Sequence, residues 1–171
     1  MSIAEPASSI PGDRPATTAC PAPRVVLDTN VVLDCFAFDD PIGQRLVERL
    51  ERGELVLMTR ADLREELIRV LGYAHLPFDA ERRSAALVRY DAHARPMTPP
   101  DPARMLARLP VCRDPDDQKF LEAARDGCAD VLVSKDKALL ELARSRMRPT
   151  PFRILKPEAL LSLDRSALAG A

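Results

Sequence analysis

Short apolar runs alternate with amphipathic stretches along most of the chain. Runs rich in Val, Leu and Ile, which are typical of buried strands, cover residues 24–27, 55–58, 130–134 and 152–155. Apolar residues at helical spacing cover 41–53, 60–71, 79–94, 101–109 and 137–143, and further helices are expected from Asp114 and after Pro157. Because strands and helices alternate without a tight hairpin signal, the pattern predicts an α/β fold. We expect three layers, α/β/α, around a parallel, Rossmann-like central sheet.

The pattern also predicts where the folded domain begins and ends. Residues 1–23 are rich in Pro, Ala, Ser and Thr and have no apolar period, so we expect a disordered leader. The chain has 171 residues, of which 46% are hydrophobic, enough for one well-buried domain. We therefore expect a single domain over 24–163 and a short tail over 164–171.

Composition excludes several classes of protein. The four cysteines show no CxxC spacing, which argues against a zinc site or a disulfide framework and favours a reduced, cytoplasmic protein. No apolar run is long enough for a membrane span, and no P-loop sequence occurs. Aromatic residues make up 4% and Trp is absent, so no platform for base stacking is visible. The net charge of -1 does not decide the partner.

An acidic residue falls where a helix should face the core. Asp114 before Pro115 predicts a helix start with Asp114 as N-cap. At about 100° per residue, Asp117 lies on the same stripe as Phe120 and Leu121. A buried carboxylate without a partner is costly, so Asp117 needs a counter-charge or a cleft in which a cation can bind.

Three further acids have a reason to lie near Asp117. Asp28 and Asp136 each follow a predicted strand, and ligands of parallel sheets bind beyond the carboxyl ends of strands. On the helix over 60–71, Glu66 lies at the margin of the apolar stripe, whereas Glu65 lies on the solvated side. Carboxylates that lie close together raise one another's pKa because their negative charges repel. A bound divalent cation is the simplest way to remove this repulsion. An all-oxygen set favours Mg²⁺ or Mn²⁺, and the chemistry that follows is phosphodiester hydrolysis.

Four segments together resemble the PIN-domain family. They are Leu27-Asp-Thr-Asn30, Glu66-Leu67 with Val70-Leu71, Arg113-Asp-Pro-Asp-Asp117 with Phe120-Leu121, and Ala129-Asp-Val-Leu-Val-Ser-Lys-Asp136. The resemblance covers about Arg24 to Leu161, and it is nearest to the branch of toxins from bacterial toxin-antitoxin pairs (VapC-like ribonucleases).

The resemblance implies a ribonuclease that depends on Mg²⁺ or Mn²⁺. Its catalytic, metal-binding residues would be Asp28, Glu66, Asp117 and Asp136, supported by Asn30, Ser134 and Asp114. Ser134 stands where many relatives have Thr, and Lys135 where many have Gly or Arg, so Lys135 could contact a phosphate or the acids. An RNA substrate, a cognate antitoxin protein and a homodimer are the implied partners.

Less specific interpretations remain open for the same residues. Asp28 and Asp136 could cap helices, Asp117 could interact only with the helix dipole, and Glu66 could form a surface ion pair. Two other functions compete with the nuclease. One is a phosphatase with Asp28 as nucleophile, against which Asn30 argues because a second acid is expected there. The other is a non-catalytic PIN-fold binding protein.

Overall fold

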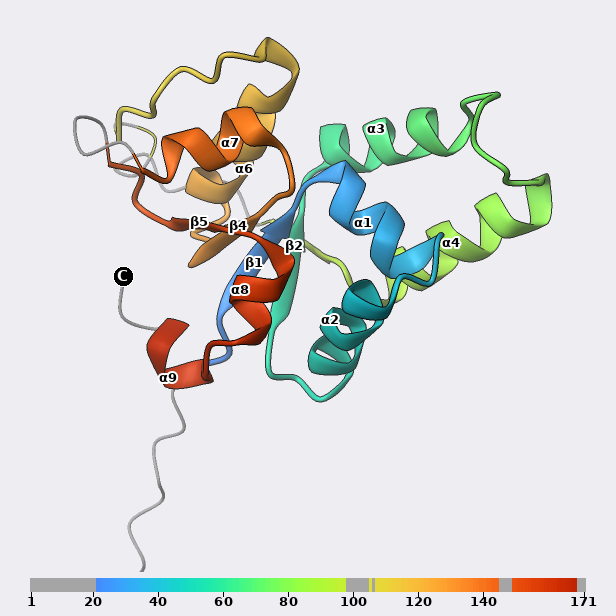
Figure 1. The fold of residues 1–171 in the computed structure, drawn as a ribbon, viewed down its shortest axis with the longest axis horizontal. Helices are drawn as coiled ribbons and strands as arrows, with labels where there is room; N and C mark the ends of the chain where they lie inside the picture. Colours follow the sequence, from blue (N-terminus) through green and yellow to red (C-terminus); the bar gives the residue numbers. More distant parts are fainter. Residues whose placement is uncertain (1–20, 98–104, 106, 145–148, 169–171) are drawn as a thin grey trace, which may run out of the picture.

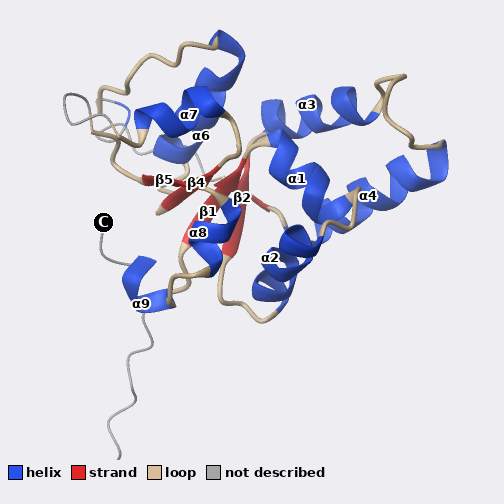
Figure 2. Ribbon diagram, in the orientation of Figure 1, coloured by secondary structure: helices blue, strands red, loops and turns tan. Residues whose placement is uncertain are grey.

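The centre of the molecule is a parallel sheet of five strands. A computed structural model describes residues 21–97, 105, 107–144 and 149–168. The strands lie in the order β3-β2-β1-β4-β5, and every pairing is parallel (Figures 1 and 2). Their bounds are Arg24–Leu27 (β1), Val56–Thr59 (β2), Arg95–Pro96 (β3), Val131–Val133 (β4) and Arg153–Leu155 (β5). The predicted parallel α/β fold is confirmed.

Helices cover both faces of the sheet. The first half of the chain contributes α1 (Thr29–Phe36), α2 (Pro41–Glu51), α3 (Ala61–Leu71) and α4 (Ala80–His93). The second half contributes a 3₁₀ turn (Pro115–Asp117), α6 (Gln118–Asp126), α7 (Lys137–Leu142), α8 (Pro157–Leu161) and α9 (Arg165–Leu168).

Alternation along β1 divides the core into two layers. Val25 and Leu27 belong to a cluster with side chains of α1, α2 and α8, whereas Val26 belongs to one with side chains of α6 and α7. Successive side chains of a strand point to opposite faces, so β1, β2, β4 and β5 each contribute to both clusters. The three-layer α/β/α arrangement follows.

The pairing of β1 with β4 places the two motif segments that follow them at one edge. Val26 lies opposite Leu132, and Leu27 lies opposite Val133. The carboxyl ends of β1 and β4 are therefore neighbours, although about a hundred residues separate them in the sequence.

Three elements were not predicted: helix α1, strand β3 and helix α9, which lies in the predicted tail. The run Val31–Leu33 lies within α1, a helix that is buried on most of its surface and so shows no amphipathic period. Strand β3 has only two exposed residues and includes Pro96, and Pro is normally confined to strand edges.

Other predicted boundaries need correction. The helix expected to start at Asp114 begins as a 3₁₀ turn, although Asp114 is its N-cap, and the α-helical part starts at Gln118. Of the helix predicted over 101–109, residues 101–104 and 106 lie outside the described residues, and 107–109 are not helical.

The ends of the predicted domain are described in part. Most of the expected leader, residues 1–20, lies outside the described residues. In the predicted tail, Leu168 of α9 is fully buried in the first core cluster. Among the described helices, none has the length and apolar character needed to cross a bilayer.

Candidate active site

One cavity of about 330 Å³ receives all four predicted catalytic acids. It lies beyond the carboxyl ends of β1 and β4, where ligands of parallel sheets bind. Asp28 and Asp136 follow these strands, Glu66 comes from α3, and Asp117 immediately precedes α6. The remaining lining is formed by Thr29, Asn30, Leu33, Phe38, Val70, Tyr73, His75, Leu76 and Phe120.

Asp28 is a buried carboxylate with fixed oxygens. Its side chain is the N-cap of α1, where Oδ1 accepts from the Val31 amide at 2.8 Å. Oδ2 accepts from the Ser134 hydroxyl and, at 3.2 Å, from the Lys135 amide. Burial raises the pKa of Asp28, and these hydrogen bonds oppose that rise. Because both oxygens are already held by hydrogen bonds, Asp28 is better suited to bind a metal ion than to attack phosphorus as the nucleophile of a phosphatase.

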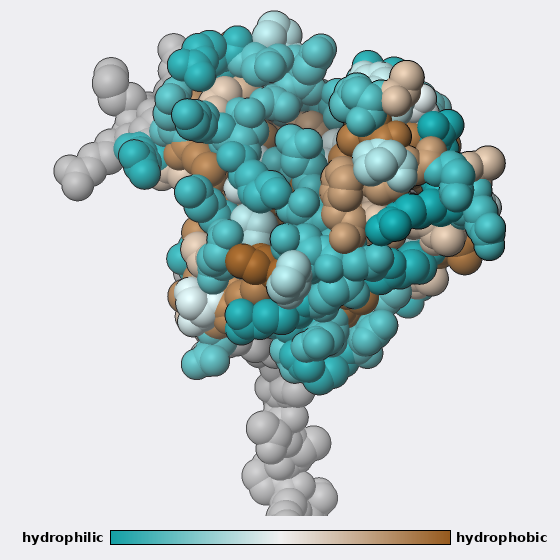
Figure 3. Space-filling view, turned by 45° about the vertical axis from the view of Figure 1, so that its right-hand side comes forward, coloured by the Kyte–Doolittle hydropathy of each residue, from teal (hydrophilic) through white to brown (hydrophobic). Residues whose placement is uncertain are grey.

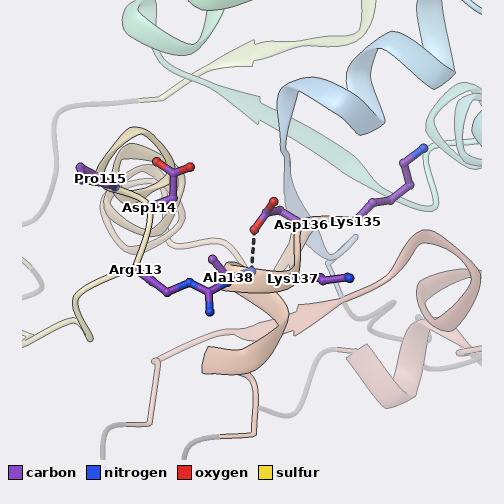
Figure 4. A pocket seen from close by; sticks show the side chains of 7 residues that line it. All are labelled: Arg113, Asp114, Pro115, Lys135, Asp136, Lys137 and Ala138. Carbon is purple, nitrogen blue, oxygen red and sulfur yellow. Dashed lines mark hydrogen bonds between the residues drawn. The ribbon is translucent and has the colours of Figure 1, made fainter.

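Ser134, the first residue after β4, connects the residue that follows β1 to the loop that follows β4. Its buried hydroxyl donates to Asp28 and accepts from the Asp136 amide at 2.9 Å. The Asp136 carboxylate in turn caps α7 by accepting from the Ala138 amide at 2.6 Å, the bond drawn in Figure 4. Helix capping, the simpler interpretation of Asp28 and Asp136, is therefore real for both residues, and both also face the cavity.

Lys135 contacts acids through both its backbone and its side chain. Its amide binds Asp28, and its ammonium group pairs with Asp34 of α1. Figure 4 shows this side chain extending away from Asp136. This arrangement orients Asp28 and ties the β4 loop to α1.

Asp117 is a second carboxyl group in the cavity whose pKa is raised. Burial, followed by the negative charges of Asp136, Asp114 and Asp28, raises its pKa to about 6. The charges of three nearby acids thus add to the effect of burial, and perturbed carboxyl groups of this kind are common at functional sites.

Glu66 is already compensated by neighbouring groups. Its Oε1 accepts from the Thr29 hydroxyl at 2.7 Å. Its Oε2 contacts the Lys119 ammonium and lies 3.7 Å from Arg69 Nη2. Glu66 thus differs from the other three acids, because a lysine in the first turn of α6 neutralises it.

The cavity fits a hard divalent cation in charge and donor type. Asp28, Asp117 and Asp136 offer carboxylate oxygens, and their repulsion is what a dication would remove. Over the described residues, no three His, Cys, Asp or Glu side chains stand close enough together to hold a metal as they are. The set therefore fits by chemistry, whereas its present spacing is wider than that of a chelating site.

The supporting residues do not all reach this cavity. Asn30 lines it and is exposed, whereas Asp114 lies outside it. Asp114 lines a neighbouring cavity of about 660 Å³ between residues 113–115 and the start of α7 (Figure 4). Asp136 lines both cavities, and Arg113 and Lys137 add positive charge to the second. Asp114 acts at a distance, as the cap of the 3₁₀ turn and as a charge that raises the pKa of Asp117.

The two side chains that bind Glu66 most closely were not predicted. Thr29 lies inside the Leu27-Asp-Thr-Asn30 motif, but its partner Glu66 is 37 positions away. Lys119 lies two positions after Asp117, and helical periodicity alone does not reveal its contact with Glu66. Adjacency to the motifs was the available signal for both residues.

Comparison with protein families gives one match. A family model described as PIN domain matches residues 24–138, a range that contains all four acids and both strands that carry them. Comparison of the sequence with curated proteins gives no match.

Proposed function

The chain belongs to the PIN-domain family, whose members are usually nucleases, and from this premise we propose that it is a metal-dependent endoribonuclease. It would hydrolyse RNA phosphodiester bonds with Mg²⁺ or Mn²⁺ at Asp28, Asp117 and Asp136. The observation that carries the proposal is the meeting of four carboxylates from distant segments in one cavity, where the pKa of Asp117 rises to about 6.

Different residues of the cavity would orient the ligands, bind the cation and balance the remaining charge. Ser134 and the Lys135 amide hold the Asp28 carboxylate in one orientation. Asp117 loses its proton near neutral pH and then offers a charged oxygen to a cation. Asp28, Asp117 and Asp136 would hold the dication, which would supply acidification of a water nucleophile and stabilisation of charge on the leaving oxygen. Lys119 balances Glu66, which leaves three acids for the metal.

The first experiment removes ligand charge without changing side-chain size. Purified Asp28→Asn and Asp117→Asn proteins should cleave single-stranded RNA at least about 100-fold more slowly than the wild type in Mn²⁺. The matched control is Asp116→Asn, because Asp116 is exposed and lines neither cavity. Circular dichroism checks the fold of each variant. Metal-dependent cleavage at the wild-type rate by both site variants would overturn the proposal.

A toxin role, a cognate antitoxin and a homodimer are part of the same proposal. Their support is the resemblance of the four motif segments to the toxin branch of the family. Induced expression in a bacterial host should arrest growth, and Asp117→Asn should relieve the arrest. Co-expression of the product of a small adjacent reading frame should do the same. Growth that is unaffected by the wild-type chain would argue against the toxin role and leave the nuclease open to its own test.

A further inference from the structure

The wall of the cavity beside the acids is apolar and partly aromatic. Phe38 follows α1, and Tyr73 and His75 follow α3; all three line the cavity together with Leu33, Val70 and Leu76. Phe38 is 42% exposed and Tyr73 is 36% exposed. Figure 3 turns the side with α1, α3 and α4 forward and shows apolar side chains gathered there among hydrophilic ones. No stacking platform was predicted from the sequence, because Phe38 and Tyr73 are far apart in the chain.

The rings of Phe38 and Tyr73 each pack against another aromatic ring and remain partly exposed to solvent. The Phe38 ring lies 4.9 Å from the buried Phe78 ring, centroid to centroid. The Tyr73 ring lies 5.6 Å from the His75 ring at an interplanar angle of 35°. Large rings of fixed orientation lose little entropy when a ligand binds. They therefore form a preorganised surface.

Arg69 links the aromatic wall to the acids. Its Nη1 donates to the Tyr73 hydroxyl at 2.9 Å, and its guanidinium carbon lies 5.9 Å from the ring centroid. Its Nη2 lies 3.7 Å from Glu66 Oε2. A ligand that places a phosphate among the acids would therefore have Tyr73 within the same cavity.

We propose that Tyr73 and Phe38 form a platform on which the nucleobase next to the cleaved phosphate stacks. The inference rests on the proposed function and adds a base-binding residue set to it. One cavity that combines carboxylates for a metal-bound phosphate with exposed rings matches the two halves of a nucleotide. Its volume of about 330 Å³ falls within the range of small-ligand pockets.

The chain is well suited to a direct test by NMR. It contains no Trp and two Tyr, and the second, Tyr90, is 3% exposed and donates its hydroxyl to Thr59. With tyrosine rings labelled, Tyr73 is the reporter and Tyr90 the internal reference, and Tyr73→Phe assigns the two signals. Adenosine 5′-monophosphate and ribose 5-phosphate are then compared in Mg²⁺, because they differ only in the base.

Stacking should shift the Tyr73 ring signals upfield with the nucleotide and leave them in place with the sugar phosphate. Calorimetry should show a roughly tenfold preference for the nucleotide, which the combined Tyr73→Leu and Phe38→Leu changes abolish. Tyr73→Phe should keep the preference because it keeps the ring. Ile68→Ala is the matched control, since Ile68 is an exposed apolar residue of α3 that does not line the cavity.

Two outcomes would overturn the platform. One is an equal shift of Tyr73 with both ligands, and the other is an unchanged preference in the leucine variant. The nuclease fails separately: a base-dependent shift in a protein that does not cleave RNA would keep the platform and remove the proposed function. Cleavage of RNA by a protein whose Tyr73 signals ignore the base would do the reverse.

Discussion

At the scale of single residues, the proposed role of Asp117 as a metal ligand would connect proton binding to metal binding. Its pKa of about 6 arises from burial and from the charges of Asp136, Asp114 and Asp28. A carboxyl group must lose its proton before it binds a cation. The proton and the metal therefore compete for this side chain, with the proton favoured below about pH 6.

This competition predicts a pH-dependent affinity for Mn²⁺. As the pH falls below about 6, the dissociation constant for Mn²⁺ should rise roughly tenfold for each unit by which the pH decreases. The reason is that one proton must leave Asp117 for each ion bound. Calorimetry in buffers of different ionisation enthalpy counts the released protons. Glu65→Gln, a change on the solvated face of α3, should keep the dependence. An affinity that is flat between pH 5 and pH 7 would contradict the assignment of Asp117 as a ligand.

Thr29 provides a second prediction at this scale. Thr29→Val removes the hydroxyl that donates to Glu66 at 2.7 Å and keeps the shape of the side chain. Unfolding in urea should show a loss of about 1–2 kcal/mol, because a poorly exposed carboxylate loses a donor. Thr29→Ser keeps the hydroxyl and should lose clearly less. Equal losses in the two variants would mean that packing, and not the hydrogen bond, is what Thr29 contributes.

The residues that could be predicted are those whose position is set by local pattern. Strand ends predicted Asp28 and Asp136, and helical phase separated Glu66 from the exposed Glu65. The partners of these acids could not be predicted, because the Thr29–Glu66 hydrogen bond and the Lys119–Glu66 ion pair join separate segments. Periodicity describes which way a side chain faces and not what it meets there.

At the scale of elements, the contact between α1 and α2 is close enough to require a glycine. A Cβ built on Gly43 of α2 would lie 2.6 Å from the carbonyl carbon and oxygen of Asp34 in α1. These are backbone atoms of a buried helix, so they cannot move aside as a side chain could.

Gly43→Ala should therefore destabilise the protein although Ala favours helices. We expect a loss of about 1–3 kcal/mol in the free energy of unfolding, measured by urea titration, because the two helices must separate. Gly72→Ala, at the end of α3, is the control. A Cβ on Gly72 would lie no closer than 3.2 Å to its nearest neighbour, the carbonyl oxygen of Arg69. A Gly43→Ala protein as stable as the wild type would show that α1 and α2 can move apart at little cost.

Elements with a clear period could be predicted, and those without one could not. The amphipathic helices α2 and α3 and the apolar strand β4 lie where the sequence predicts them, within two residues at each end. Helix α1 is buried on nearly all sides, so its pattern matches neither a helix face nor a strand. Strand β3 owes its existence to the exposed edge of β2 and not to its own residues.

At the scale of the whole molecule, Arg49 joins the first half of the fold to the last helices. It is 7% exposed, and its Nη1 donates to the carbonyl groups of Leu160 and Leu163 while its Nε binds Glu54 at 3.1 Å. Its neighbours Glu48 and Arg52 are charged, so nothing local in the sequence indicates that Arg49 is buried. The helix α8, more than a hundred positions later, is what buries it.

Metal binding should stabilise the entire domain. At a Mg²⁺ or Mn²⁺ concentration 100-fold above its dissociation constant, the folded state gains about 2.7 kcal/mol. For a chain of this size, this gain corresponds to a rise in melting temperature of roughly 5–10 °C, measured by differential scanning calorimetry. Asp28→Asn and Asp117→Asn should remove most of the rise, and Asp116→Asn should preserve it. A melting temperature that does not respond to either metal would refute the metal centre.

The bridge made by Ser134 also bears on grafting this chemistry onto another scaffold. The Ser134 hydroxyl donates its single proton to Asp28 and accepts a hydrogen bond from the Asp136 amide. The residues that follow β1 and β4 are therefore oriented by the same group. A designer who transplanted the carboxylates alone would leave Asp28 without the Ser134 hydroxyl that donates to its Oδ2. The smallest unit that carries this oriented pair of acids is therefore the adjacent strands β1 and β4 with the first residues after each, and Asp117, which immediately precedes α6, has to be supplied separately.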